Sequence, residues 1–346
     1  MKKSMKTIIG LAIAGAVAFG GYKFANTSAS PNTEEAEEAE KVAPVGPEFN
    51  ADSAFAFCDK QCSFGPRIMN SDAHDKCGKW IIEKFKSYGC KVTTQDADLK
   101  GYDGTMLKSS NIMASVNPDA STRILICAHW DCRPWADNDP DSTNHKKPVM
   151  AANDAASGIG VMLELARILN NPKLSQNFPK DLGVDFVCFD AEDWGVPSWE
   201  TNYQDTGDSW ALGAQYFSKN LPQGYEARYG ILLDMVAGQG AHFYQEQGSL
   251  QYAPEIVKKV WKAARQAGYR DYFPNDKGGW ITDDHVPVNQ NTNIPTIDVI
   301  AYYPECMQSS FGPTWHTVQD DMAHIDKSTL KAVGQTLIQV LYTEMK

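Results

Sequence analysis

The chain has 346 residues and a hydrophobic content of 42%, which is ample for a full core. Its formal net charge of -11 disfavours nucleic acid and an anionic membrane surface as partners, and the composition is typical of a soluble enzyme. Length alone is compatible with one large domain or two smaller ones.

The first 29 residues have the composition of an export signal or an N-terminal anchor. The basic start MKKSMK is followed by 14 apolar or small residues, IIGLAIAGAVAFGG, whereas a membrane span needs about 20. We expect residues 1–29 to be a signal peptide, with an uncleaved anchor as the alternative because no A-x-A site stands out after Phe24. The expected location is the periplasm or cell envelope of a bacterium, with no stable membrane partner beyond this possible anchor.

Residues 30–48 are expected to form an acidic linker. Five Glu fall within residues 34–40, and the Pro- and Gly-containing stretch VAPVGPE follows them. Such a segment has little apolar surface to bury and is expected to be solvated. The folded catalytic domain is therefore expected to span residues 49–346, beginning near Phe49.

Eight cysteines are present, an even number that permits full pairing in an exported protein, although sequence does not give the connectivity. Cys127 and Cys188 lie within apolar strands and are expected to be buried thiols. Cys58 and Cys62 are four apart, as in some metal sites, but no second pair matches them, so we interpret them as ordinary thiols.

Strand-like apolar runs alternate with helical patterns along the rest of the chain. Four runs carry a polar residue at or near the carboxyl end: 123–131, 182–193, 229–236 and 294–300. Helical patterns cover 157–171, 254–268 and 326–346. This alternation predicts an α/β domain with a largely parallel sheet and helices on both faces. Ligands of such sheets bind outside the carboxyl ends of the strands, so we expect the polar residues there to converge.

The residues expected at this edge are carboxylates and histidines from six segments. They are His129, Asp131, Asp154, Glu192, Asp193, Asp234, Asp283, Asp284, His285 and His316. Each alone has an ordinary explanation: Asp154 could cap a helix, and His129 could be a satisfied core histidine. Asp190 is expected to brace its loop, and Asp320 and Asp321 to be solvated or capping. Taken together, the set favours a metal site.

Zinc is the metal that this set favours. Carboxylate oxygen with imidazole nitrogen suits zinc, and a catalytic zinc keeps three protein ligands and an open position. Consecutive residues at the end of a strand point to opposite sides, so Glu192 and Asp193 are not expected to bind the same ion. We expect one of the two to bind the metal and the other to transfer protons.

The motifs HWD, NDAASG, FDAED, LLDMVAG, TDDHVPV and WHT, in this order, resemble the bacterial glutaminyl cyclases of the zinc aminopeptidase-like superfamily. The similarity covers roughly residues 55–346. It implies a single α/β domain with a twisted mixed sheet and one zinc per chain. It also implies an acyltransferase activity that converts N-terminal glutamine of peptides or proteins to pyroglutamate and releases ammonia.

The resemblance assigns roles residue by residue. It implies that Asp154, Asp193 and His316 bind the zinc. It implies that Glu192 is the general acid and base, and that Asp234 and Asp283 are supporting catalytic residues.

The peptidase branch of the same superfamily remains the alternative, because it uses this scaffold with two zinc ions. Carried over from that branch, His129 and Asp234 would hold a second ion beside Asp154, and all of these positions are filled here. The aromatic residues favour the cyclase, because dry aromatic walls exclude the water that a peptidase needs. Those that resemble the cyclase pocket are Trp194, Trp199, Phe311 and Trp315.

Three positions depart from the animal cyclases. Asp298 stands where those enzymes have a His, and Thr282 stands where a Gln precedes the catalytic Asp. Ala128 occupies the place of the first Cys of their disulfide. The hydrogen bonding around Asp234 and Asp283 is therefore expected to differ from theirs.

Overall fold

A computed structural model of the chain describes residues 41–344. The predicted signal segment and the first part of the predicted linker lie outside the described residues. From Ala43 onward the linker is bound to the domain, since the Val45 N–H donates to Gln339 Oε1 at 2.8 Å and the Phe49 N–H to Gln335 Oε1 at 2.9 Å. Ordered structure thus begins before Phe49, because side-chain amides on the last helix satisfy the backbone of a segment that composition marks as solvated.

A seven-stranded sheet forms the centre of residues 41–344, in the order β1-β2-β4-β3-β5-β7-β6. The strands are β1 (Lys91–Lys100), β2 (Met106–Val116), β3 (Thr122–His129), β4 (Leu182–Phe189), β5 (Gly230–Asp234), β6 (His242–Phe243) and β7 (Thr296–Tyr302). The four central strands β4, β3, β5 and β7 run parallel, whereas β1, β2 and β6 pair antiparallel at the edges. The predicted single α/β domain with a mixed, mostly parallel sheet is confirmed.

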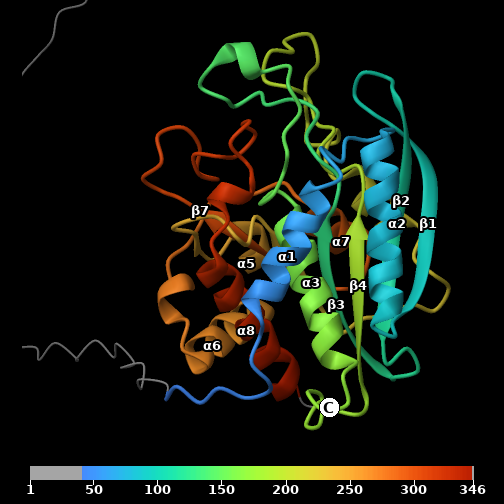
Figure 1. The fold of residues 1–346 in the computed structure, drawn as a ribbon, viewed down its shortest axis with the longest axis vertical. Coiled ribbons are helices and arrows are strands. Elements are labelled where there is room, and N and C mark those ends of the chain that lie inside the picture. Colours follow the sequence, from blue (N-terminus) through green and yellow to red (C-terminus); the bar gives the residue numbers. More distant parts are fainter. Residues whose placement is uncertain (1–40, 345–346) are drawn as a thin grey trace, which may run out of the picture. The chain divides into compact units, whose positions relative to one another are not determined.

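Helices cover both faces of this sheet (Figure 1). They are α1 (Ala51–Cys62), α2 (Asp72–Ser87), α3 (Ala156–Leu169), α4 (Leu212–Lys219), α5 (Gln247–Tyr252), α6 (Pro254–Ala267), α7 (His285–Asn291) and α8 (Lys327–Thr343), with short 3-10 helices at Ser142–Asn144, Arg270–Tyr272 and Met322–His324. On the face toward the viewer α2 and α3 lie on the strands and α1 packs on α3; α4 and α7 cover the other face. None of the helices in residues 41–344 is long and apolar enough to cross a membrane.

Successive side chains of β3 point alternately into two hydrophobic cores, one on each face of the sheet. Ile124 and Ile126 point into the core beneath α3, whereas Leu125 and Cys127 point into the smaller core beneath α4 and α7. Gly158 lets α3 approach the sheet closely, because a Cβ there would lie 2.6 Å from both Ala128 Cβ and the Leu233 carbonyl oxygen. This packing brings the start of α3 to the carboxyl ends of the central strands.

All eight cysteines lie in the described part of the chain, and all are free thiols. Cys127 and Cys188 are fully buried in their strands, as expected. The side chain of Asp154 makes no capping hydrogen bond to α3, so its capping role is excluded and another role must explain its burial.

Candidate active site and metal centre

The candidate residues reach one place because the parallel strands end there together. β3 ends at His129 and β5 ends at Asp234, while Glu192 and Asp193 follow β4 after a short turn. Asp154 comes from the segment just before α3 and Asp283 from the segment before α7. His316 comes from the long segment after β7, so residues far apart in sequence share one buried site.

Asp154, Asp193 and His316 form a group with the composition and spacing of a metal site. One donor atom of each lies within 4.8 Å of the others. His316 Nε2 lies 3.3 Å from Asp193 Oδ1 and 3.6 Å from Asp154 Oδ2, and all three side chains are buried. Asp193 Oδ2 is buried and faces no donor from residues 41–344, which would be costly without a cation. Two carboxylates and one imidazole are ligands that zinc prefers, so these residues fit a zinc ion.

A second group lies beside the first and shares Asp154. His129 Nε2 is 2.8 Å from Asp154 Oδ1 and 3.5 Å from Asp234 Oδ1. One donor atom of each of these three residues lies within 4.8 Å of the others. Burial lowers the pKa of His129, but its hydrogen bonds to Asp131, Asp154 and Asp234 outweigh burial and hold that pKa well above its usual range. The structure thus provides positions for a second ion or, in its place, a charged histidine.

Backbone hydrogen bonds hold the proposed ligands in position. Asp131, fully buried, accepts hydrogen bonds from the backbone N–H groups of Glu192 and Asp193, each at 3.1 Å. Asp320 accepts from the N–H groups of Asn153 at 2.7 Å and of Asp154 at 3.0 Å. The expectation that Asp320 is solvated or capping is therefore wrong, because the chain after His316 folds back and buries its carboxylate under Asp154.

Two further acids, Asp321 and Asp190, have the structural roles that the sequence predicted for them. Asp321 is partly exposed and accepts the N–H of Ala323 at 2.9 Å, which makes it the cap of a 3-10 helix. Asp190 is fully buried, lies 2.8 Å from His74 Nε2 and accepts the N–H of Ser110 at 2.7 Å. Asp190 therefore braces the loop after β4 and belongs to neither metal group.

Arg133 is a component of the site that the sequence did not reveal. This fully buried side chain pairs with Asp137 at 2.7 Å and lies 3.4 Å from Asp193 Oδ1. Its guanidinium also stacks over Trp210, with Cζ 4.6 Å from the ring centroid. Breaking such a buried ion pair typically costs about 3–5 kcal/mol. The signal available in the sequence was a single Arg directly after a strand end, in HWDCRPW, which is too common to be decisive.

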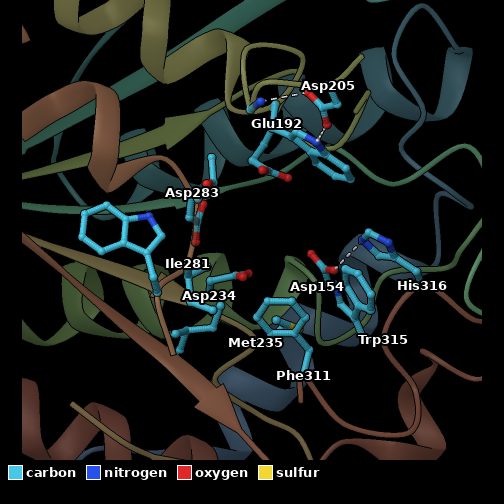
Figure 2. A pocket seen from close by; sticks show the side chains of 15 residues that line it. Asp154, Glu192, Asp205, Asp234, Met235, Ile281, Asp283, Phe311, Trp315 and His316 are labelled. Carbon is cyan, nitrogen blue, oxygen red and sulfur yellow. Dashed lines mark hydrogen bonds and ion pairs between the residues drawn. The ribbon is translucent and has the colours of Figure 1, made fainter. Parts of the chain in front are cut away.

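A pocket of about 370 Å³ opens beside these groups. Figure 2 shows Glu192, Asp234 and Asp283 facing Asp154 and His316 across this space, with Phe311 and Trp315 forming part of its wall. Trp315 stacks on His316 with ring centroids 3.8 Å apart. Phe311 and Trp315 therefore lie where the sequence analysis placed them.

Trp194 and Trp199 do not line this pocket, and their expected position is corrected. They pack instead on Trp135, with ring centroids 5.4 and 6.1 Å apart, in a separate aromatic cluster. Trp210 and Trp280 take their place in the wall. The cause is the path of the loop after β4, which leaves the site and returns so that the Trp210 ring fills the space over Gly195, where a Cβ would lie 2.0 Å from the ring.

The three carboxyl groups proposed for catalysis line the pocket and are each at least nine-tenths buried. Burial raises the pKa of Glu192 well above its usual range, and the charges of Asp193 and Asp283 raise it further against the opposing effect of His129. Burial, together with the charge of Asp154, raises the pKa of Asp234 to about 8. Burial also raises the pKa of Asp283. Raised pKa values of this kind are typical of carboxyl groups that transfer protons in active sites.

The family is shown by the sequence. The model of peptidase family M28 matches residues 111–341. The chain belongs to peptidase family M28. Members of this family and their glutaminyl cyclase relatives depend on zinc, in agreement with the donor groups described above.

Solved structures similar to this M28 chain include both cyclases and a peptidase. A glutaminyl cyclase of Bacteroides thetaiotaomicron bound to N-acetylhistamine is 49% identical, covers 87% of this chain and 100% of its own, and superposes with a TM-score of 0.83. A leucine aminopeptidase precursor from the same organism is 48% identical, with coverage of 88% and 100% and a TM-score of 0.82. The predicted resemblance to bacterial glutaminyl cyclases is confirmed.

Relatives with lower sequence identity also include both a cyclotransferase and an aminopeptidase. The glutaminyl-peptide cyclotransferase of Bothrops jararaca is 27% identical over 68% of this chain and 65% of its own length. Aminopeptidase YwaD of Bacillus subtilis is 26% identical over 79% of this chain and 53% of its own length. The chain thus spans between half and two thirds of these two relatives.

Proposed function

We propose that the protein is a zinc-dependent acyltransferase that converts the N-terminal glutamine of peptides or proteins to pyroglutamate and releases ammonia. The observation that carries this proposal is the pocket, which sets three buried carboxyl groups and an aromatic wall beside the group Asp154, Asp193 and His316. The similarity to solved bacterial glutaminyl cyclases supports it.

Asp154, Asp193 and His316 would hold one zinc ion per chain. When bound, zinc polarises the carbonyl group of the glutamine side chain and stabilises negative charge that develops on its oxygen. Arg133 and Asp137 keep two of these ligands in place, because Arg133 contacts Asp193 and Asp137 Oδ1 lies 3.5 Å from His316 Nδ1.

Glu192 would carry the proton that the reaction must move. The α-amino nitrogen of the substrate bonds to the side-chain amide carbon, and the bond from that carbon to the amide nitrogen breaks. The amine loses one proton and the departing amide nitrogen gains one, so a single carboxylate can accept the first and deliver the second. The raised pKa of Glu192 suits both steps. Asp234 and Asp283 would orient the amine and the leaving ammonia.

The aromatic wall would hold the glutamine in the curled conformation that cyclisation needs. Attacking and attacked groups belong to the same residue, so most of the catalytic gain would come from orientation. Trp210, Trp280, Phe311 and Trp315 surround this space and would exclude the water that could compete with the amine.

A dizinc exopeptidase is the second candidate, because the group His129, Asp154 and Asp234 could hold a second ion. The structural neighbours include a leucine aminopeptidase precursor, which also supports this candidate. The two candidates predict different products and different metal contents.

Mass spectrometry of the products separates them. Purified zinc-loaded protein is incubated with a peptide that begins with Gln and, separately, with the same peptide beginning with Leu. Loss of one ammonia from the Gln peptide and no change in the Leu peptide support the cyclase. Removal of a whole residue from the Leu peptide, with two zinc ions per chain by elemental analysis, supports the exopeptidase and contradicts our proposal.

A further inference from the structure

A second acidic cluster lies behind the pocket wall and has no role in the proposed metal sites. Asp298, in the middle of β7, is fully buried, and its backbone N–H donates to Ser249 Oγ at 2.8 Å. One atom each of Asp298, Asp283 and His285 lies within 4.8 Å of the others. Asp283 joins this cluster to the pocket, because it also lines the pocket.

The cluster contains more carboxyl groups than basic side chains. His285 is its basic residue, with Nε2 3.4 Å from Glu246 Oε2 and Nδ1 3.9 Å from Asp298 Oδ2. Glu246 is the better anion of these two acids, because it accepts N–H groups from Gly248, Ser249 and Ile281. His285 therefore lies nearer to Glu246 than to Asp298, and this one imidazole faces an excess of carboxyl groups.

One oxygen of Asp283 lies within 4.8 Å of one oxygen of Asp298, and both carboxyl groups are buried. Two buried carboxylates this close do not both ionise. Asp283 Oδ1 accepts the N–H of Asp284 at 2.5 Å, which favours an ionised Asp283. Neither oxygen of Asp298 accepts a hydrogen bond from the described residues, so no such bond stabilises an ionised Asp298.

We infer that Asp298 is a neutral carboxylic acid that donates a hydrogen bond to the Asp283 carboxylate and so fixes its position in the pocket. Asp298 is thus a positioning residue, and its role in turnover rests on the proposed function. The titratable groups that face it from the packed elements are Cys127 on β3, Asp234 on β5, Glu246 before α5, and Asp283 and His285 at the start of α7. Burial and the charges of Asp283, Asp234 and Glu246 raise the pKa of Asp298 well above its usual range, in agreement with this inference.

Two substitutions at this position test whether Asp298 is a neutral hydrogen-bond donor or a buried anion. Asp298→Asn keeps the shape and supplies an N–H donor to Asp283, whereas Asp298→Leu keeps a similar volume and supplies none. We expect kcat/KM for a Gln-initiated peptide to stay within about threefold of wild type in Asp298→Asn. In Asp298→Leu it should fall about 10- to 100-fold, mainly in kcat, as for loss of a hydrogen bond to a charged group. Zinc content should be unchanged in both variants.

Infrared spectroscopy tests protonation directly and requires no activity. The difference spectrum between wild type and Asp298→Asn at neutral pH should show loss of the carbonyl band of a protonated carboxylic acid. Asp185→Asn is the matched control, because Asp185 is also buried in a strand but pairs with Arg123 at 2.6 Å and should lose carboxylate bands.

Three results of the infrared and kinetic measurements would overturn the inference. They are loss of carboxylate bands in Asp298→Asn, a fall in kcat/KM in Asp298→Asn as large as in Asp298→Leu, and wild-type kcat in Asp298→Leu. A lower metal content in Asp298→Asn would also overturn it, because the cluster would then hold a cation in place of the proton. If the wild-type protein does not cyclise Gln peptides, the proposed function fails, and the infrared spectra still decide the state of Asp298.

Discussion

Asp320 should stabilise the protein through the two backbone N–H groups that it accepts. Its carboxylate is 1% exposed and holds the N–H groups of Asn153 and Asp154. Asp320→Ala would leave both donors buried without a partner, and each such orphan costs about 1–3 kcal/mol, so the free energy of unfolding should fall by roughly 2–6 kcal/mol. Asp320→Asn keeps one acceptor oxygen, so its cost should be about half of that.

Urea unfolding of the zinc-loaded proteins at pH 8 measures these differences. Burial, together with the charge of Asp154, raises the pKa of Asp320 to about 7, so at pH 8 the side chain is mostly a carboxylate that can accept both hydrogen bonds. Asp321→Ala is the matched control, since this partly exposed neighbour caps a short 3-10 helix and should cost about 0.5–2 kcal/mol. If Asp320→Ala costs no more than Asp321→Ala, the reasoning about the buried donors is refuted.

Three further predictions follow from the site. His316→Ala should lose bound zinc, as measured by elemental analysis after gel filtration, because it removes the one imidazole of the group Asp154, Asp193 and His316; retention of one zinc per chain would contradict that group. Gly195→Ala should displace Trp210, raise KM for a Gln peptide and destabilise the fold by about 1–3 kcal/mol; unchanged kinetics would show that Trp210 does not shape the pocket. In metal-free protein, Asp234 with a pKa of about 8 and Asp320 with a pKa of about 7 bind more protons folded than unfolded. The free energy of unfolding should therefore decrease as pH rises from 4 through 8, and urea midpoints that rise over this range would contradict these shifts.

The parallel centre of the fold was predictable because its strands are buried on both faces. β3, β4, β5 and β7 are mostly apolar, and polar residues at or just after the ends of β3, β4 and β5 reach the site. The antiparallel pair β1 and β2 was not foreseen, since β1 alternates between exposed and half-buried residues and carries charges like a surface loop.

Residue roles that depend on contacts between distant segments were harder to predict from the sequence. The convergence of Asp154, Asp193 and His316 followed from strand ends and from a family resemblance. Asp320 was missed because a capping Asp and one that accepts distant backbone N–H groups look alike in sequence. Trp210, in place of Trp194 and Trp199, depends on the path of the loop after β4, which no local pattern encodes.

The most direct test of the account is the substitution Glu192→Gln in zinc-loaded protein. Glu192 lines the pocket but does not belong to the group Asp154, Asp193 and His316, so zinc content should remain that of the wild type. Conversion of a Gln-initiated peptide should fall by about 100- to 10,000-fold, the usual contribution of a positioned acid and base. Activity near that of the wild type would show that Glu192 does not carry the proton, and the proposed mechanism would be wrong.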